Sequence, residues 1–91
     1  DGMACRVPEP AAFEIIRRGA ARIVEVDDAA IAAAMRSAIE TTHTVVEGAG
    51  AAALAAAMRE REGLAGRRVG LIFSGGNIDR ARYAAVLAET P

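Results

Sequence analysis

The chain contains no lysine, because all 11 of its cationic residues are arginine. It also lacks tryptophan, and its aromatic residues are only Phe13, Phe73 and Tyr83, whereas alanine is by far its commonest residue. Alanine buries little apolar area, so a core built mainly from it is thin. A domain of this length buries only about 60% of its unfolded surface. We therefore expect several apolar faces of these 91 residues to need a partner surface.

Charge and cysteine content exclude several classes of function. The formal net charge is −1, which gives no electrostatic basis for binding nucleic acid or an anionic membrane. The single cysteine, Cys5, excludes an internal disulfide, and we expect it to be a small buried residue rather than a reactive thiol. No apolar run approaches the ~20 residues needed to span a bilayer, and no signal peptide is visible. We expect a cytoplasmic protein.

The pattern of apolar residues predicts an α/β fold. Val69–Phe73 shows no polar alternation, so we expect a parallel strand that is covered on both faces. Arg22–Val26 is rich in β-branched residues and is the other candidate strand. The order helix, strand, helix, helix, strand, helix predicts a three-layer parallel-sheet segment with a right-handed crossover. The four helices are expected at residues 11–18, 28–42, 49–62 and 80–89.

Turn and cap residues set the expected ends of these elements. Asp27 or Asp28 is expected to cap the second helix, and Asn77 the last one. Gly63 is expected to end the third helix in a left-handed conformation, and Gly66 to turn the chain into the second strand.

A polar, glycine-rich stretch, Ser74-Gly75-Gly76-Asn77, follows the second predicted strand. In open parallel sheets the ligand crevice lies just beyond the carboxyl ends of the strands, and glycines let a backbone approach a ligand closely. Ser74 and Gly75 are therefore candidate ligand contacts. The alternative is a simple connection between strand and helix. The stretch is not the Gly-x-Ser-x-Gly elbow of a nucleophilic serine, so no catalytic residue is assigned.

The run Gly48-Ala49-Gly50-Ala51-Ala52-Ala53 satisfies the dinucleotide-binding fingerprint, yet it lacks a full strand before it and an acidic residue about 20 positions later. We favour a helix start that presses against a flat ligand or a neighbouring backbone. Glu47 is either a carboxylate favoured by the helix dipole or the edge of a cofactor site. His43 has no second histidine or carboxylate cluster nearby in the sequence, which predicts a cap or surface residue and no metal site.

Three separated motifs together resemble one family. They are Asp1-Gly2, the run Val45–Ala55 that contains Glu47-Gly48-Ala49-Gly50, and Ser74-Gly75-Gly76-Asn77-Ile78-Asp79. In this order they resemble the carboxyl-terminal part of the catalytic domain of pyridoxal-phosphate-dependent threonine/serine dehydratases. These are fold-type-II enzymes, similar to the tryptophan synthase β chain. The resemblance covers nearly the whole chain, which implies that residues 1–91 are a fragment of that large domain.

The resemblance also implies a site and an activity. Ser74 would hydrogen-bond the pyridine nitrogen of pyridoxal 5'-phosphate, and Gly75 and Gly76 would shape the loop under the ring. Gly2 would lie near the cofactor and Glu47 near the ring edge. The full-length enzyme would eliminate water from L-threonine or L-serine to give a 2-oxo acid and ammonia. It would be a dimer or tetramer of identical chains. Close relatives act on hydroxyaspartate or racemise their substrate.

One departure from the family pattern concerns the missing lysine. Such enzymes hold the cofactor as a Schiff base to a lysine, and this chain has neither that residue nor the family's glycine-rich phosphate loop. We therefore expect the 91 residues alone to be inactive and to supply half of a site. Two alternatives stay open: a non-catalytic interaction module derived from this fold, and a dinucleotide-binding unit.

Overall fold

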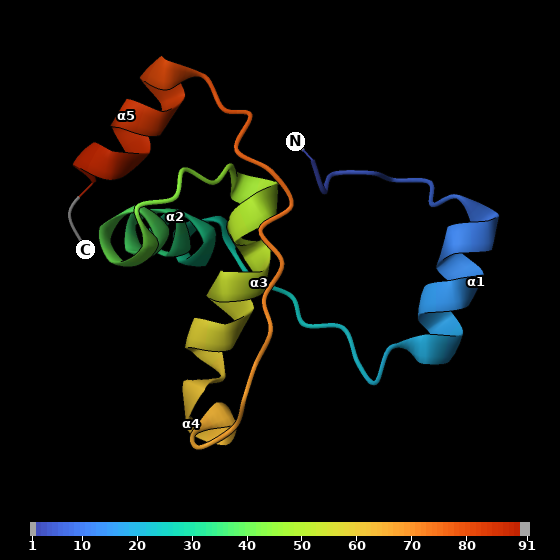
Figure 1. The fold of residues 1–91 in the computed structure, drawn as a ribbon. Helices are drawn as coiled ribbons and strands as arrows, with labels where there is room; N and C mark the ends of the chain where they lie inside the picture. Colours follow the sequence, from blue (N-terminus) through green and yellow to red (C-terminus); the bar gives the residue numbers. More distant parts are fainter. Residues whose placement is uncertain (1, 90–91) are drawn as a thin grey trace.

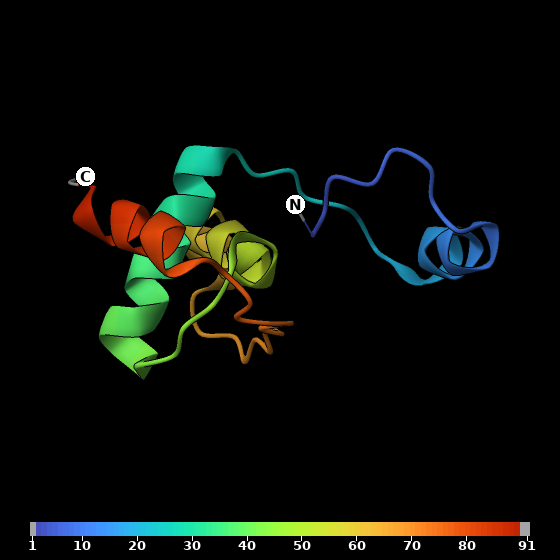
Figure 2. The same ribbon diagram turned by 90° about the horizontal axis from the view of Figure 1, so that it is seen from above.

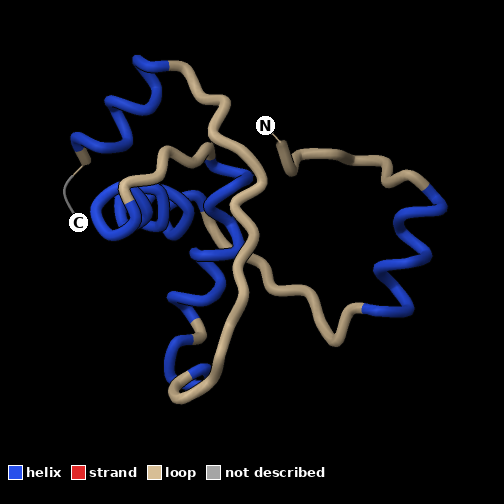
Figure 3. Tube along the Cα trace, viewed as in Figure 1, coloured by secondary structure: helices blue, strands red, loops and turns tan. Residues whose placement is uncertain are grey.

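The computed structural model describes residues 2–89, in which five helices are joined by turns and extended segments (Figure 1). Figure 3 shows helix and loop but no strand over these residues. Within the same range, no helix is both long enough and apolar enough to cross a bilayer. The helices are α1 (Pro10–Gly19), α2 (Asp28–Thr42), α3 (Gly48–Arg59), α4 (Arg61–Leu64) and α5 (Arg80–Ala88).

The predicted parallel sheet is not confirmed in the described part of the chain. Residues 22–26 and 69–73 form no strand, because a strand also needs a neighbour that pairs with its backbone N–H and C=O groups. The two segments cross in Figure 1, but Figure 2 shows that they are separated. The expectation that residues 69–73 are covered on both faces is wrong for this chain. Ile72 is 79% exposed, and Ile23 in the other segment is 77% exposed.

The core lies between α2 and α3, which make the most extensive helix–helix contact of the described residues. Its side chains are small, so the two helices are held by many short-range contacts rather than by large aromatic groups. Tyr83 and Val86 of α5 pack against this core from one side. Met35 and Ala38, which lie three positions apart on one face of α2, are both buried. The buried hydrophobic residues are Ala34, Met35, Ala38, Val46, Ala51 and Ala55.

Both ends of α2 follow from local chemistry. At its start, the Asp27 carboxylate accepts a hydrogen bond from the Ala30 backbone N–H over 2.8 Å, which satisfies one of the unpaired donors of the first turn. At its end, His43 adopts the left-handed conformation with φ 55°, and its backbone N–H donates to the Ile39 carbonyl oxygen. His43 is exposed, so the prediction of a cap or surface histidine is confirmed.

The other predicted caps differ from the structure. The third predicted helix is interrupted at Glu60, whose backbone leaves the helical region, and Gly63 lies inside α4 instead of ending a helix. The left-handed glycine is Gly66, with φ 77°, which makes the predicted turn. Asp79, not Asn77, occupies the N-cap position of α5, and its side chain makes no capping hydrogen bond.

Helix α1 lies on an arm away from α2, α3 and α5, and it contacts none of the described helices (Figure 1, Figure 2). The radius of gyration is 14.2 Å, compared with about 12 Å for a compact domain of this length. On α1, Phe13 is 50% exposed and Ile15 73% exposed. These apolar side chains agree with the expectation of faces that lack a partner.

Ion pairs form at three places on the described residues, and one of them joins Arg36 of α2 to Glu89 after α5 over 3.2 Å. On α1, Glu14 pairs with Arg17 and Arg18, and these hydrogen bonds hold the pKa of Glu14 below its usual value. The segment before α2 is joined to the end of α3, where the Arg22 guanidinium donates two hydrogen bonds to the Glu60 carboxylate. The hydrogen bonds from Arg22 hold the pKa of Glu60 below its usual value as well.

Candidate functional site

The first turn of α3, which we call the α3 start (Gly48-Ala49-Gly50), is where two distant parts of the chain meet. The chain near Gly2 lies against it so closely that a Cβ on Gly2 would be 2.7 Å from the Ala49 Cβ. The loop Ser74-Gly75-Gly76, which we call the glycine loop, meets it from the other end of the sequence. The α3 start therefore brings together segments that the sequence places more than 70 positions apart.

The contact between the α3 start and the glycine loop is made by backbone. A Cβ on Gly50 would lie 2.5 Å from the Gly75 carbonyl oxygen and 3.2 Å from the Gly75 nitrogen. The same carbonyl oxygen accepts a hydrogen bond of 3.1 Å from the Glu47 backbone N–H, one of the donors left unpaired at a helix start. The sequence predicts that this helix start presses against a neighbouring backbone or a flat ligand. At Gly50 the neighbour is backbone, that of Gly75.

The other glycines of the glycine loop also lie close to neighbouring atoms. A Cβ on Gly75 would lie 2.6 Å from the Glu47 Oε1, and one on Gly76 would lie 2.5 Å from the Val45 carbonyl oxygen. Glu47 is half-buried, occupies the N-cap position of α3 and makes no side-chain capping bond. Its carboxylate lies over the loop instead of over the helix end. The interpretation of Glu47 as only a helix-start carboxylate does not account for this position.

Ser74 is exposed at the surface of the glycine loop, so its hydroxyl is not enclosed in an apolar core. The structure brings the four predicted cofactor contacts into one region: Gly2 and Glu47 flank the α3 start, and Ser74 and Gly75 lie in the loop that packs on it. Cys5 is exposed, which corrects the expectation that it is a buried residue.

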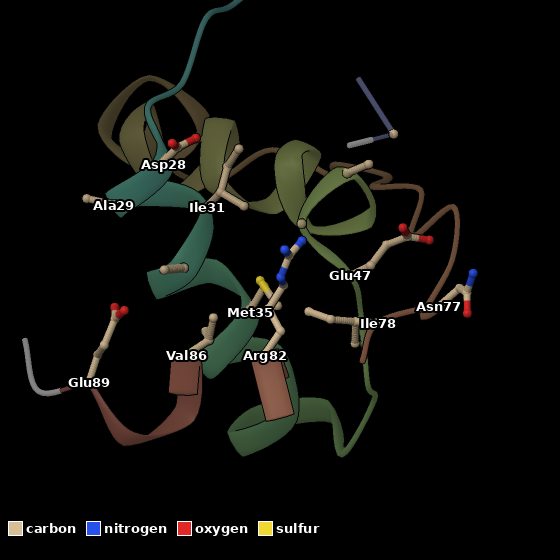
Figure 4. Close-up of a pocket in the computed structure, with 14 residues that line it drawn as sticks. Asp28, Ala29, Ile31, Met35, Glu47, Asn77, Ile78, Arg82, Val86 and Glu89 are labelled. Atoms are coloured by element: carbon tan, nitrogen blue, oxygen red, sulfur yellow. The ribbon is translucent and has the colours of Figure 1, made fainter. Parts of the chain in front are cut away.

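A cavity of about 510 Å³ opens beside the α3 start, between α2 and α5. Figure 4 shows Met35, Ile78 and Arg82 directed toward its centre, while the Glu47 carboxylate points toward the side of the glycine loop. Asp28 and Glu89 lie at its opposite end. The cavity thus combines an apolar floor with carboxylates and one guanidinium at its walls, which suits a small ligand with both apolar and charged parts.

The contribution of α5 to this cavity is not predicted by the sequence. Arg82 and Val86 belong to a helix that was predicted only as the last element of the fold, and Ile78 belongs to the motif without an assigned role. No local pattern marks these residues, because they reach the cavity only when α5 packs against α2. No group of three or more histidine, cysteine, aspartate or glutamate side chains within residues 2–89 is placed to hold a metal ion.

Comparison with known proteins identifies the family. Residues 1–75 match the family described as pyridoxal-phosphate dependent enzymes. The chain is 42% identical over 88 residues to an L-threonine ammonia-lyase of Geobacter sulfurreducens, an alignment that covers 96% of this chain and 22% of that protein. It belongs to the pyridoxal-phosphate-dependent threonine/serine dehydratase family.

Two further proteins that the chain resembles carry other names. An L-threo-3-hydroxyaspartate ammonia-lyase of Saccharomyces cerevisiae is 37% identical over 76 residues, which is 84% of this chain and 23% of that protein. A serine racemase of Schizosaccharomyces pombe is 35% identical over 77 residues, or 85% of this chain and 24% of that protein. The chain therefore spans about a quarter of the length of the curated relatives that it matches.

The loop that packs on the α3 start carries a side chain, Ser74, that fits the dehydratase family's cofactor, pyridoxal phosphate. Gly2 packs on Ala49, and the glycine loop packs on Glu47 and on the Val45 carbonyl, which fixes the course of both segments beside the α3 start. In this loop, Ser74 supplies an exposed hydroxyl, which can donate or accept a hydrogen bond at a ring nitrogen.

Proposed function

We propose that residues 1–91 are the carboxyl-terminal part of the catalytic domain of an ammonia-lyase. The enzyme would eliminate water from a hydroxy amino acid, L-threonine or L-serine, to give a 2-oxo acid and ammonia. The observation that carries this proposal is the meeting of Gly2, Glu47 and the glycine loop at the α3 start. The names of the relatives, which are ammonia-lyases for threonine and for hydroxyaspartate, support a lyase.

Each residue of the site has a proposed role toward the cofactor. Pyridoxal phosphate, when bound, supplies the electron sink for removal of a proton and loss of the β-hydroxyl. The Ser74 hydroxyl would hydrogen-bond the pyridine nitrogen, and because it is neutral it would not enforce a protonated ring as a carboxylate would. Gly75 would leave room under the ring, Gly2 would lie near the cofactor, and Glu47 would lie at the ring edge.

The remainder of the site would come from other parts of the protein. Because this chain has no lysine, the lysine that holds the cofactor in the dehydratase family would lie elsewhere in the polypeptide. In the same large domain, residues 22–26 and 69–73 would pair with other segments as strands of a parallel sheet. The parent enzyme would be a homo-oligomer, a dimer or a tetramer.

The test uses the full-length protein that carries this chain. We expect it to release a 2-oxo acid from L-threonine, L-serine or L-threo-3-hydroxyaspartate, which is measured as the hydrazone absorbance. Ser74→Ala should weaken cofactor binding about fivefold, since one hydrogen bond contributes about 1 kcal/mol. Ser37→Ala is the control, because Ser37 is the other serine of the chain and lies on α2. It should leave cofactor binding unchanged. Absence of 2-oxo acid from all three substrates would contradict the proposed activity.

A second candidate is a non-catalytic interaction module. The exposed apolar side chains of α1 and of residues 69–73 favour it, because such surfaces commonly bind protein. The same assay separates the two candidates: a module would give no 2-oxo acid and would be indifferent to Ser74→Ala.

A further inference from the structure

We propose that Gly50 is a positioning residue for Ser74. The inference rests on the proposed function, in which the Ser74 hydroxyl contacts the cofactor. Gly50 itself lies in α3 and is buried, so it acts on the site only through the glycine loop.

The glycine loop is held against α3 from two sides. The Glu47 backbone N–H donates to the Gly75 carbonyl oxygen over 3.1 Å, which draws the loop toward the helix start. The bare Cα of Gly50 permits this approach, since a Cβ there would lie 2.5 Å from the same oxygen. The Gly75 nitrogen, 3.2 Å from the same Cβ position, shares a planar peptide unit with the Ser74 carbonyl, so a methyl group that displaces this nitrogen also displaces the Ser74 backbone.

The obstacle that a Cβ on Gly50 would meet is backbone on both sides. The Gly75 nitrogen and carbonyl oxygen cannot rotate away as the end of a side chain can. A methyl group at position 50 therefore has to displace the glycine loop as a whole or distort α3. Alanine is a better helix former than glycine, so the helix resists distortion and the loop is the part that moves.

The chain offers a matched control in the same turn of the helix. A Cβ on Gly48 would lie 3.6 Å from the Ile31 Cγ2, which is ordinary van der Waals contact. Gly48→Ala and Gly50→Ala add the same methyl group to the same turn. They differ in whether that methyl meets the glycine loop.

The experiment compares Gly48→Ala and Gly50→Ala in the full-length protein that carries this chain. Hydrogen exchange, read by mass spectrometry with fragmentation, follows two amides in the cofactor-free protein. The Glu47 amide reports on the loop, because it bonds to the Gly75 oxygen, and the Ala51 amide reports on α3, because it bonds to the Glu47 oxygen. We expect Gly50→Ala to speed exchange of the Glu47 amide about tenfold, as overpacking of one contact predicts, and to leave Ala51 unchanged.

Cofactor affinity is measured on the same proteins by absorbance titration with pyridoxal phosphate. Gly50→Ala should weaken binding about tenfold, while Gly48→Ala should change neither the affinity nor either amide. Unchanged Glu47 exchange in Gly50→Ala would overturn the inference, and so would equal acceleration of both amides, which marks a general loss of stability. Faster Glu47 exchange with unchanged affinity would also overturn it, provided that Ser74→Ala weakens binding. Unchanged affinity in Ser74→Ala itself points to failure of the proposed function instead.

Discussion

The backbone N–H of Glu47 donates a hydrogen bond to the carbonyl oxygen of Gly75, and this bond joins the N-cap of α3 to the loop that carries Ser74. Both groups are backbone, so neighbouring side chains affect the bond only through the space that they occupy. Gly50 and Gly76 lie beside it, and at each of them a Cβ would meet backbone at 2.5 Å. The site therefore depends on how closely two pieces of backbone approach each other.

Alanine substitutions at Gly75 and Gly76 should differ in their effect on stability. A Cβ on Gly76 meets the Val45 carbonyl oxygen, whereas one on Gly75 meets the end of the Glu47 side chain, which can rotate away. We expect Gly76→Ala to lower the free energy of unfolding by about 1–3 kcal/mol and Gly75→Ala to lower it by less, measured by urea unfolding. Adding Glu47→Ala to Gly75→Ala should remove most of the remaining cost. An equal loss for both single variants would contradict this reading of the loop.

Removal of the α2 cap should lower stability. Asp27→Ala deletes the acceptor of the Ala30 N–H and should reduce the free energy of unfolding by about 1 kcal/mol, while Asp27→Asn should keep most of it. Asp28→Ala is the control, because Asp28 lies in the first turn without being the cap residue. Thermal and urea unfolding measure the difference. The assignment of the cap fails if Asp28→Ala costs as much as Asp27→Ala.

The ion pair between Arg22 and Glu60 should appear in the titration of the Glu60 carboxyl group. The hydrogen bonds from Arg22 hold its pKa in the folded protein below the usual 4.5. A lowered folded pKa means that the pair stabilises the protein above pH 4.5 and that this contribution is lost as the pH falls through the folded pKa. Carbon-detected NMR should show the Glu60 midpoint rising toward 4.5 in Arg22→Gln. The Glu14 midpoint, set by Arg17 and Arg18, should stay where it is.

Truncation of Met35 should cost much more stability than truncation of Phe13. Met35 is 3% exposed in the core between α2 and α3, so Met35→Ala should cost about 2–5 kcal/mol. Phe13 is half exposed on α1, which contacts no other described helix, so Phe13→Ala should change the free energy of unfolding of the 91-residue chain by no more than about 0.5 kcal/mol. Denaturant unfolding of the two variants checks this. A large loss for Phe13→Ala would show that α1 packs on the core in solution.

The 91-residue chain alone should have no lyase activity. It has no lysine with which to hold pyridoxal phosphate, so mixing it with the cofactor and L-threonine should give no more 2-oxo acid than the cofactor alone. The full-length protein, assayed in parallel, is the positive control. Turnover by the isolated chain above the cofactor blank would refute the expectation that it supplies only half of a site.

Features set by neighbouring residues could be predicted from the sequence. The start of α2 depends on an Asp27 carboxylate that accepts from a backbone N–H three residues away, and its end depends on the conformation of His43. The buried positions Met35 and Ala38 follow from helical spacing. In each case the partner lies within a few residues, so the sequence carries the information.

Features that depend on distant partners could not be predicted in this way. The apolar run 69–73 indicates a segment that is buried in its final environment, but the pattern does not say which atoms bury it, and here Ile72 is 79% exposed. The sequence likewise left open whether Gly50 faces a ligand or a backbone, since Gly75 lies far along the chain. Arg82 reaches the cavity only through the packing of α5 on α2, which no motif encodes.

The alanine-lined contact between α2 and α3 has a mechanical consequence. Ala34, Ala38, Ala51 and Ala55 are fully buried there, and a methyl group has no rotamers to lose or exchange. The distance between the two helices is therefore set by the polypeptide backbone itself. Thermal motion cannot change this distance by repacking side chains. The start of α3, against which Gly75 packs, should therefore be among the stiffest parts of the molecule.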